Sequence, residues 1–381
     1  MTELKIPFNQ PCLSGNELKY IEEALLNRHI SGDGIFSKKC HANLEERIGV
    51  PKALLTTSCT HALEMCALLL DIHLGNEVIV PSFAFVTTVN AFVMRGARPV
   101  FIDIRPDTLN LDEAQLERLI TSRTKIIVAL HYAGVGCEMD AINTIADRYK
   151  IAVVEDNAHG LFGKYKGRNL GTFGCLATLS FHETKNITCG EGGALLINDK
   201  KYFTRAEILR EKGTNRSQFF RGEVDKYTWV DLGSSYLPSD ILAAYLFAQL
   251  EASEAIQERR KKIWQYYFEQ LAPWAEQKGV SLPFSPSYCE HPYHLFYLLC
   301  PSLEKRTKLI EGLKSRGILS VFHYLPLHLS PMGQKWGYKT GDCPVTEDVS
   351  NRLVRLPFYY QLSPDDQERV CDAIFKVSQR W

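Results

Sequence analysis

The sequence has no excess of charge of either sign: among its 381 residues, Lys and Arg together number 44, and Asp and Glu also number 44. A balanced chain has no overall field that would recruit nucleic acid or an anionic membrane surface. Any anion must therefore be bound locally, by a few residues. This balance argues against a protein that binds nucleic acid or membrane surfaces through its net charge.

The sequence also lacks the patterns of an exported or membrane-spanning protein. Its 11 cysteines are an odd number and include no C-x-x-C pair, so they suggest neither a disulfide framework nor a zinc motif. No apolar run approaches the roughly 18 residues of a membrane helix. The segment 1–7 has no apolar signal core. We expect free thiols, no membrane partner and a cytoplasmic location.

Two further motifs are missing. The glycines of the segment 190–193 do not have the G-x-G-x-x-G spacing, and the apolar run 194–197 reads as a strand where a dinucleotide fingerprint needs a helix. His323 and His328 flank Pro326 in an extended run, and no third ligand follows at metal-site spacing. We therefore predict neither a Rossmann dehydrogenase nor a metal site, and interpret both histidines as core or substrate-contact residues.

What the chain does contain is an alternation of short apolar strands with amphipathic helices through its first two thirds. This rhythm is typical of a mostly parallel sheet with crossover helices. The expected strands are 53–57, 77–81, 99–104, 126–130, 152–155 and 177–181, and two of the expected helices are 111–120 and 139–149.

The length of the chain favours two domains, because one hydrophobic core rarely serves so many residues. A long helix is expected at about 238–271, and we place the domain boundary within it. The prediction is a large domain of residues 1–250 and a smaller α+β domain of residues 251–381. The smaller domain should contain strands at 294–299 and 318–323 and a helix at 306–315.

Lys185 stands in a distinctive setting, between the apolar strand 175–179 and the glycine-rich segment 190–193. An amine held at the end of a strand can lose enough water to become neutral, and a neutral lysine can form a Schiff base. Most lysines are solvated surface groups, so this position alone is a weak indication. The prediction depends on what surrounds the amine.

Asp156 closes the apolar run 151–154, which fits a strand buried on both faces. Its carboxylate then lies at the carboxyl end of the strand, where open α/β sheets bind their ligands. A carboxylate in such a place can keep the ring nitrogen of pyridoxal phosphate protonated. The alternative is that Asp156 is a helix cap or an ordinary loop acid.

A strand-to-helix turn at 54–64 offers a phosphate site. Amides at the start of a helix point outward and attract anions, and the hydroxyls of Ser58 and Thr60 would add donors. The same residues also suit an ordinary helix cap. Further along, Phe85 follows the strand 77–81, where its ring would either stack on a flat heterocycle or join the core.

The loop 212–226 combines cations with aromatic rings. Arg216 and Arg221 provide forked donors suited to a diphosphate, and Phe219 and its neighbours offer rings for a base or sugar. We expect this loop to contact the substrate or a second subunit, rather than to be only a solvated surface loop.

Four motifs carry a family resemblance: Pro-Ser-Phe-Ala-Phe at 81–85, Glu-Asp-Asn-Ala-His at 155–159, Ser-Phe-His-Glu-Thr-Lys-Asn at 180–186 and His-Tyr-Leu-Pro-Leu-His at 323–328. In order and spacing, and over its whole length, the chain resembles the nucleotide-sugar aminotransferases of the DegT/StrS family. The resemblance implies an α/β protein of the PLP-dependent transferase fold type I, like aspartate aminotransferase. Its large domain would have a mostly parallel sheet and its C-terminal domain would be a smaller α+β unit.

The resemblance also implies roles for individual residues. Lys185 would bind pyridoxal 5'-phosphate covalently and then carry the proton, and Asp156 would pair with the pyridinium. The other expected cofactor-binding residues are Ser58, Cys59, Thr60, Phe85, His159 and Ser180. The expected substrate-binding residues are Arg216, Arg221, Phe219, His323, Tyr324 and His328. Where many members have an asparagine that reaches the phosphate of the second subunit, this chain has Leu237, so Ser234 or Ser235 is a candidate replacement.

Segments 211–229 and 131–134 extend the resemblance to one branch of the family, whose product serves surface-antigen synthesis. That branch aminates C4 of dTDP-4-keto-6-deoxy-D-glucose to give dTDP-4-amino-4,6-dideoxy-D-galactose. The implied amino donor is L-glutamate, and the implied assembly is a homodimer with shared active sites. The glucose-configured C4 amine and amination at C3 stay open. Two remote alternatives are a sugar dehydratase, in which histidine replaces the lysine, and a non-catalytic PLP-binding regulator.

Overall fold

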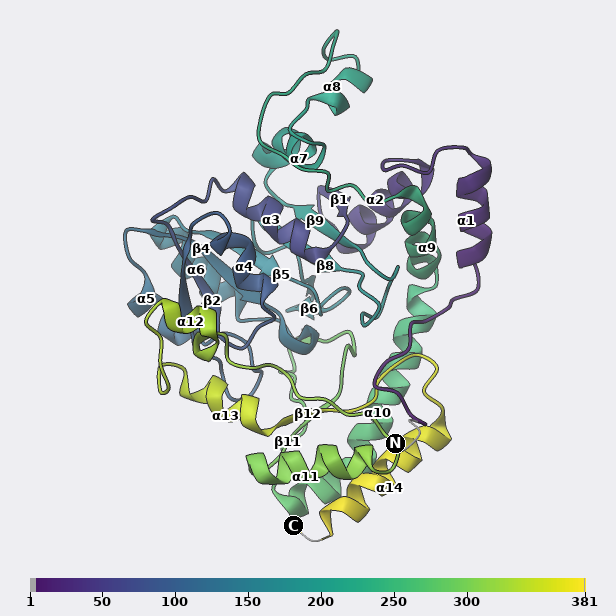
Figure 1. The fold of residues 1–381 in the computed structure, drawn as a ribbon, viewed down its shortest axis with the longest axis vertical. Coiled ribbons are helices and arrows are strands. Elements are labelled where there is room, and N and C mark those ends of the chain that lie inside the picture. The colour runs from purple at the N-terminus through teal and green to yellow at the C-terminus, as the bar shows by residue number, and fades with distance from the viewer. Residues whose placement is uncertain (1–4, 380) are drawn as a thin grey trace.

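A computed structural model describes residues 5–379 and 381, and its centre is a seven-stranded sheet in the order β1-β9-β8-β5-β4-β2-β3 (Figure 1). Neighbouring strands run parallel except where β9 pairs with β1 and β8. This confirms the predicted mostly parallel sheet. The strands are β1 (Lys52–Thr56), β9 (Gly193–Ile197), β8 (Leu176–Ser180), β5 (Ala152–Asp156), β4 (Thr124–Leu130), β2 (Glu77–Pro81) and β3 (Arg98–Ile102).

Both faces of this sheet are buried, as the side chains of β4 show. Val128 belongs to a core cluster with α3 (Cys59–Leu69) and α4 (Thr87–Val93). Its neighbour Ile127 belongs to another cluster with α6 (Met139–Tyr149). Successive side chains of a strand point to opposite faces, so a strand covered on both sides reads as a continuous apolar run. A third cluster joins α2 (Ile35–Ile48) and α9 (Asp240–Glu251) to β1, β8 and β9.

A separate core cluster lies in the C-terminal part of the chain, at the lower end of the view in Figure 1. It joins α10 (Ser253–Lys278), α11 (Leu303–Lys314) and α14 (Pro364–Ser378) to β11 (Tyr297–Leu299) and β12 (Leu353–Arg355). Ile6 also packs here, although it lies at the other end of the sequence. The domain boundary near residue 250 stays a prediction, and Ile6 would be an exception to it.

Three expected elements differ from the prediction. The helix expected at 238–271 is two helices, α9 and α10, which are separated at Ala252. The Ser253 hydroxyl donates to the Leu250 carbonyl (2.6 Å) across this break. The helix expected at 111–120 is reduced to a 3-10 turn (Glu113–Gln115) and the single turn α5 (Leu116–Leu119). The strand expected at 318–323 forms only two isolated bridges, from Ile318 to Ile6 and from Val321 to Arg355. Each bridge joins it to a different segment, so no continuous strand pairing forms.

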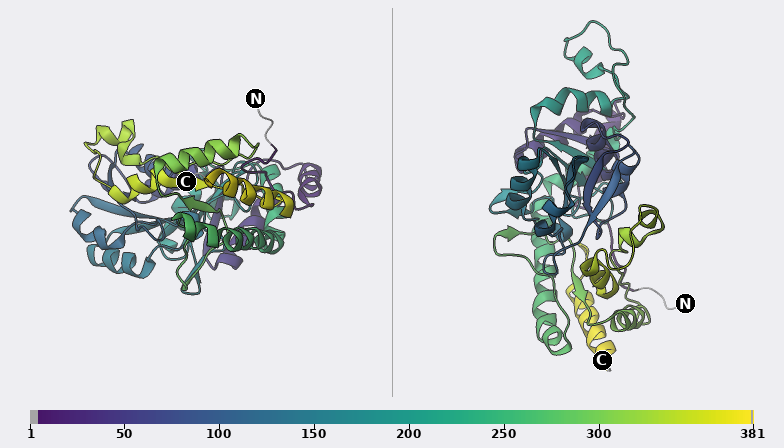
Figure 2. Two further views of the ribbon diagram at one scale, coloured as in Figure 1. Left: turned by 90° about the horizontal axis from the view of Figure 1, so that it is seen from below. Right: turned by 90° about the vertical axis from the view of Figure 1, so that its left-hand side faces the viewer.

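A projecting hairpin, residues 211–235, stands away from the rest of the molecule. It carries α8 (Arg216–Phe220) and is closed by isolated bridges between Glu211 and Ser235 and between Thr214 and Trp229. It follows α7 (Phe203–Arg210) and points away from α14 in Figure 1 and in the right-hand view of Figure 2. Several of its large apolar side chains are exposed, among them Phe220 and Trp229.

No described helix is both long and apolar enough to cross a bilayer. The expectation about a signal segment rests on residues 1–7, of which 1–4 lie outside the described residues. All 11 cysteines are free thiols in the structure. Within residues 5–379 and 381, no group of three His, Cys, Asp or Glu side chains is arranged to hold a metal ion.

Candidate active site

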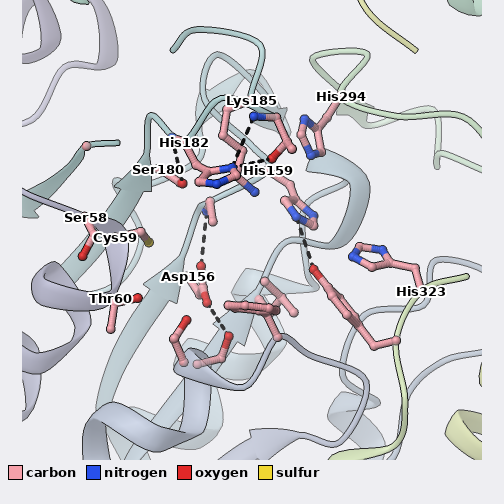
Figure 3. Close-up of a pocket in the computed structure, with 18 of the residues that line it drawn as sticks. Ser58, Cys59, Thr60, Asp156, His159, Ser180, His182, Lys185, His294 and His323 are labelled. Atoms are coloured by element: carbon pink, nitrogen blue, oxygen red, sulfur yellow. Dashed lines mark hydrogen bonds between the residues drawn. The ribbon is translucent and has the colours of Figure 1, made fainter. Parts of the chain in front are cut away.

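The carboxyl ends of β1, β2, β5 and β8 lead to the same edge of the sheet, and a cavity of about 530 Å³ opens there. Figure 3 shows this cavity in close-up. Parallel sheets bind ligands at this edge because the loops that follow the strands diverge there. The lining residues that the argument uses are Ser58, Cys59, Thr60, Phe85, Thr88, Asp156, His159, Ser180, Lys185, His294, His323, Tyr324 and Arg355.

Lys185 extends into this cavity from the turn that follows β8 (Figure 3). Its backbone N–H donates to the His182 carbonyl (2.9 Å), which fixes the turn. Burial lowers the pKa of the amine to about 8, with the nearby Arg355 acting in the same direction, while Cys59 and Asp156 oppose the shift. A lysine with such a pKa is partly neutral near pH 7, which is the state that attacks an aldehyde.

Asp156 lies at the end of β5 and is held in place by two donors. The Thr88 hydroxyl donates to Oδ2 (2.7 Å) and the Ala158 N–H donates to Oδ1 (3.2 Å). Burial raises the pKa of the Asp156 carboxyl, although these two hydrogen bonds act against the shift. A buried carboxyl of this kind is stabilised as the anion when a cation such as a protonated ring nitrogen lies beside it.

The start of α3 lines the same cavity as Lys185 and is the candidate site for an anion. Ser58 is the helix cap: its hydroxyl accepts from the His61 N–H (3.1 Å), so the alternative reading of Ser58 as a cap holds. The amides of Cys59 and Thr60 precede the first intrahelical hydrogen bond and are available to an anion. Gly193 is required here, because a Cβ on it would lie 2.4 Å from the Cys59 nitrogen.

Aromatic and imidazole rings form another wall of the cavity. The His159 ring stacks on His294 with centroids 4.4 Å apart, and its Nδ1 is buried without a hydrogen-bond partner among the described residues. Tyr324 lies 3.5 Å from His159 Nε2 and packs near Phe85, with ring centroids 6.3 Å apart. Burial lowers the pKa of His159 and of His323, so both rings are neutral at physiological pH.

Four predicted substrate residues do not reach this cavity in their own chain. Arg216 pairs with Glu211 (2.7 Å) and Arg221 pairs with Glu207 (2.9 Å), both in or beside the projecting hairpin. With Phe220 they line a different cavity, near α2 and α7. Phe219 packs against Phe220 and Tyr227 on the same hairpin.

The fourth is His328, which is fully buried. Its Nδ1 lies 2.6 Å from the Ser82 hydroxyl and its Nε2 lies 3.0 Å from Glu347, so it ties the loop after β2 to α13 (Pro344–Arg352). This geometry agrees with the core reading of His328 rather than with a substrate contact. Leu237 packs on Gly32, and Ser234 and Ser235 are exposed and do not line the Lys185 cavity.

Among the lining residues that the sequence did not single out, three bear on the chemistry of the cavity. Thr88 orients Asp156, His294 stacks on His159, and Arg355 brings a guanidinium from β12. Thr88 could have been found, because it lies three residues after Phe85, in the first turn of the helix α4 that follows β2. His294 and Arg355 come from the C-terminal part of the chain, and no local pattern connects them to Lys185.

These residues match the needs of pyridoxal phosphate: a buried reactive amine, an acid for a ring nitrogen, a helix start for a phosphate and rings for a planar heterocycle. Two observations support this match independently of any sequence motif. Among the described residues, the buried Nδ1 of His159 has no hydrogen-bond partner, and α3 is capped by Ser58 while its first amides stay available to a ligand. The fold and the cavity therefore define the class of PLP-dependent enzymes of fold type I.

Comparison with known proteins identifies the family. Residues 11–375 match the DegT/DnrJ/EryC1/StrS aminotransferase family, and the chain belongs to it. A relative described as an uncharacterized protein of Methanocaldococcus jannaschii is 35% identical over 380 residues, which cover 98% of this chain and 97% of the relative. The chain is thus an aminotransferase that uses pyridoxal phosphate.

Solved structures of similar fold agree with this family assignment. A putative sugar aminotransferase of Streptococcus pneumoniae, in its PMP form, superposes with a TM-score of 0.92 at 26% identity, covering 99% of this chain and 100% of that one. DesV of S. venezuelae superposes with a TM-score of 0.88 at 28% identity, covering 99% of each chain. Helicobacter pylori PseC, an aminotransferase involved in pseudoaminic acid biosynthesis, gives 0.87 at 25% identity, covering 99% and 100%. The chain is accordingly a sugar aminotransferase.

Proposed function

We propose that the chain transfers an amino group from L-glutamate to C4 of dTDP-4-keto-6-deoxy-D-glucose, giving dTDP-4-amino-4,6-dideoxy-D-galactose for surface-antigen synthesis. The observation that carries the amination is the cavity in which Lys185, with a pKa lowered to about 8, shares one space with the buried Asp156. The choice of sugar rests on the resemblance of segments 211–229 and 131–134.

Pyridoxal phosphate, when bound, supplies an aldehyde that accepts an amine and a ring that delocalises the electron pair left by a departing proton. Cys59 and Thr60 would hold its phosphate through their amides, and the hydroxyls of Thr60 and Ser180, which line the same cavity, would add donors. Asp156 would hold a proton on the ring nitrogen by charge. The neutral His159 would lie near the phenolic oxygen.

Lys185 has two tasks in this proposal. Its neutral Nζ would hold the cofactor's aldehyde carbon covalently until an amino donor takes its place. The freed Nζ would then carry a proton between the donor's α-carbon and the cofactor in the first half of the reaction, and between the cofactor and C4 of the sugar in the second. Among the residues that line the cavity, Lys185 is the one amine available for this transfer.

The projecting hairpin supports a homodimer with shared sites. Arg216, Arg221 and Phe219 lie away from the Lys185 cavity of their own chain, yet the hairpin exposes Phe220 and Trp229 to solvent. Exposed aromatic side chains on one projection are typical of an interface. We assign the hairpin to the second subunit's site, where the two arginines would contact the diphosphate of the nucleotide sugar.

The location and the domain boundary belong to the same proposal. Eleven free thiols suit a reducing compartment, so we place the enzyme in the cytoplasm. We place the division between the PLP-binding domain and the C-terminal domain near residue 250, close to the end of α9.

The decisive experiment incubates the purified holoenzyme with L-glutamate and a panel of nucleotide-linked keto-sugars, with product structures assigned by NMR. The proposal predicts an axial amine at C4 of the dTDP-linked 6-deoxy sugar, which is the galactose configuration. An equatorial C4 amine, or amination at C3, would assign the enzyme to a different branch while leaving the transamination intact. Absence of any aminated product would refute the proposed function.

A further inference from the structure

Asn186, the residue after Lys185, is buried and engages three groups of the C-terminal part of the chain. Its Nδ2 donates to the Pro292 carbonyl (2.7 Å) and to Gln257 Oε1 (3.0 Å), and its Oδ1 lies 2.9 Å from His294 Nδ1. Each partner lies at least 71 residues further along the chain. One side chain therefore anchors the turn that carries the lysine to a distant segment.

This anchored amide determines where His294 carries its proton. The two oxygen acceptors use both hydrogens of the Asn186 amide, so its Oδ1 must face His294. The orientation of Gln257 agrees, because its own Nε2 donates to the Pro292 carbonyl (3.2 Å). An amide oxygen can only accept, so the proton is on His294 Nδ1. Burial lowers the pKa of His294, and a neutral ring protonated on Nδ1 has a bare Nε2.

The bare Nε2 belongs to a ring that lines the Lys185 cavity. The His294 ring stacks on His159, with centroids 4.4 Å apart. Within 5–379 and 381, no hydrogen bond joins its Nε2 to another residue. After burial, the nearby His159 and Lys185 contribute most to lowering the pKa of His294, so the ring is within electrostatic reach of the amine. Both side chains lie on the same side of the cavity in Figure 3.

The Lys185 amine would gain direction from such an acceptor. No residue that the structure describes forms a hydrogen bond or ion pair with its Nζ, and the four-carbon stem leaves it free to rotate. A neutral amine has two N–H donors and one lone pair. When one N–H is held by a fixed acceptor, the lone pair points away from that acceptor and can be aimed at a reacting carbon.

We propose that Asn186 and His294 are a positioning pair for Lys185: Asn186 fixes the turn and the His294 tautomer, and His294 Nε2 accepts a hydrogen bond from the free Lys185 amine. Neither residue needs to touch a substrate. The inference rests on the proposed function, because it concerns the amine during the interval when it is not bound to the cofactor.

The first test measures the rate at which pyridoxal phosphate attaches to the apoprotein as a function of pH. A charged amine donates a stronger hydrogen bond than a neutral one, so the Nε2 acceptor favours the protonated amine. His294→Phe should therefore lower the pKa of Lys185 further, and the midpoint of the profile should move down by about one pH unit. Asn186→Ala releases the tautomer and should move the midpoint in the same direction.

Asn198→Ala is the matched control. Asn198 also fixes a turn through its amide, which donates to two carbonyls outside the cavity (3.0 and 2.8 Å). This variant should keep the wild-type midpoint. The other titratable groups within electrostatic reach of the amine are the same in every variant: Cys59, Asp156, His159, His323 and Arg355.

The second test follows both half-reactions of the holoenzyme by stopped flow, with rates expressed per covalently bound cofactor. His294→Phe should slow the glutamate step and the keto-sugar step by the same factor, about 10-fold, because one lysine serves both. The half-saturating concentrations of both substrates should stay unchanged. The double variant with Asn186→Ala should be no slower than His294→Phe alone, since the two changes remove one shared contact.

A third measurement needs no variant. Neutron diffraction from crystals of the deuterated wild-type holoenzyme should show deuterium on Nδ1 of His294 and none on Nε2.

Three results would each overturn the positioning pair: deuterium on His294 Nε2, a wild-type attachment midpoint in His294→Phe, or slowing confined to one half-reaction, which would make His294 a substrate contact instead. A wild type that attaches the cofactor at Lys185 but aminates no keto-sugar refutes the proposed function, and leaves the expected results for attachment intact.

Discussion

The cavity around Lys185 and the projecting hairpin both contain cationic side chains, but the cations differ in burial and in pairing. In the cavity, Lys185 and Arg355 are desolvated and lack carboxylate partners within 5–379 and 381, the part of the chain that the structure describes. On the hairpin, Arg216 and Arg221 are partly exposed and already paired with glutamates of their own chain. Unpaired buried cations attract a ligand strongly, whereas paired exposed ones contribute little until their surroundings change.

Lys185→Ala should have the largest effect, because in the proposed function this one residue supplies both the nucleophile and the proton carrier. Turnover should fall by about four orders of magnitude or more, and the yellow absorbance of covalently bound cofactor should disappear. Lys201→Ala is the matched control, since Lys201 is exposed and pairs with Asp199 (2.7 Å). If Lys185→Ala kept a turnover within tenfold of wild type, the cavity would be no more important for catalysis than the hairpin.

Asp156→Asn should cause the second-largest loss of turnover. The amide keeps the shape of the side chain and can still hydrogen-bond, but it cannot hold a proton on the ring nitrogen by charge. Cofactor binding should survive while turnover falls on the order of 100- to 1000-fold. Absorbance titration with pyridoxal phosphate and steady-state kinetics separate these two properties. Activity within a few fold of wild type would show that another group pairs with the ring.

The pH dependence of cofactor attachment tests whether the Lys185 amine is desolvated, unlike the exposed cations of the hairpin. Because the pKa of Lys185 is lowered to about 8, the neutral amine becomes scarcer below that value. Attachment to the apoprotein should therefore slow about tenfold per pH unit below about pH 8 and level off above it. Arg355→Gln should move the midpoint upward, since it removes a like charge. A rate that rises steadily to about pH 10.5 would show an ordinary, solvated lysine.

Arg216→Ala and Arg221→Ala should give the smallest effect, because in the proposed function each arginine would exchange an existing ion pair for a substrate contact. The KM for the keto-sugar should rise about tenfold for each change, with the glutamate half-reaction unaffected. Stopped-flow measurement of the two half-reactions makes the distinction. Equal slowing of both steps, or of neither, would exclude the hairpin as the diphosphate contact.

Mixed dimers locate the hairpin's site of action. A Lys185→Ala chain paired with an Arg216→Ala/Arg221→Ala chain contains one site with an intact lysine and an intact hairpin from its partner. If hairpins serve the second subunit, the mixture should regain activity that neither parent dimer has at low keto-sugar concentration. Activity that merely averages the parents would assign the hairpin to its own chain or to no site.

The sequence predicted those parts of the site that follow directly from a strand. Asp156 and Lys185 come after apolar runs, and parallel strands bring such positions to one edge, so local pattern and sheet topology predicted that the two side chains would share one cavity. Their roles were implied by the family resemblance. The start of α3 was predicted for the same reason. The branch of the family to which the chain belongs, and its sugar, stay predictions that rest on resemblance.

The rest of the site depends on tertiary packing. His294 and Arg355 reach the cavity from β11, β12 and their flanking segments, which a separate core places beside the sheet. His328 looked like a contact residue because of its motif, but Ser82 and Glu347 engage both of its ring nitrogens inside the core. The hairpin arginines were recognised as a group that would contact the substrate or a second subunit, but the sequence did not indicate that they would pair with Glu207 and Glu211 of their own chain.

The most direct test of the central claim is reduction of the holoenzyme with borohydride, followed by proteolysis and mass spectrometry of the pyridoxyl-labelled peptide. The chain contains many lysines, and the account predicts that the label lies on Lys185 alone, in the peptide that follows β8. A label on any other lysine would contradict the assignment of the cavity at the carboxyl edge of the sheet as the active site.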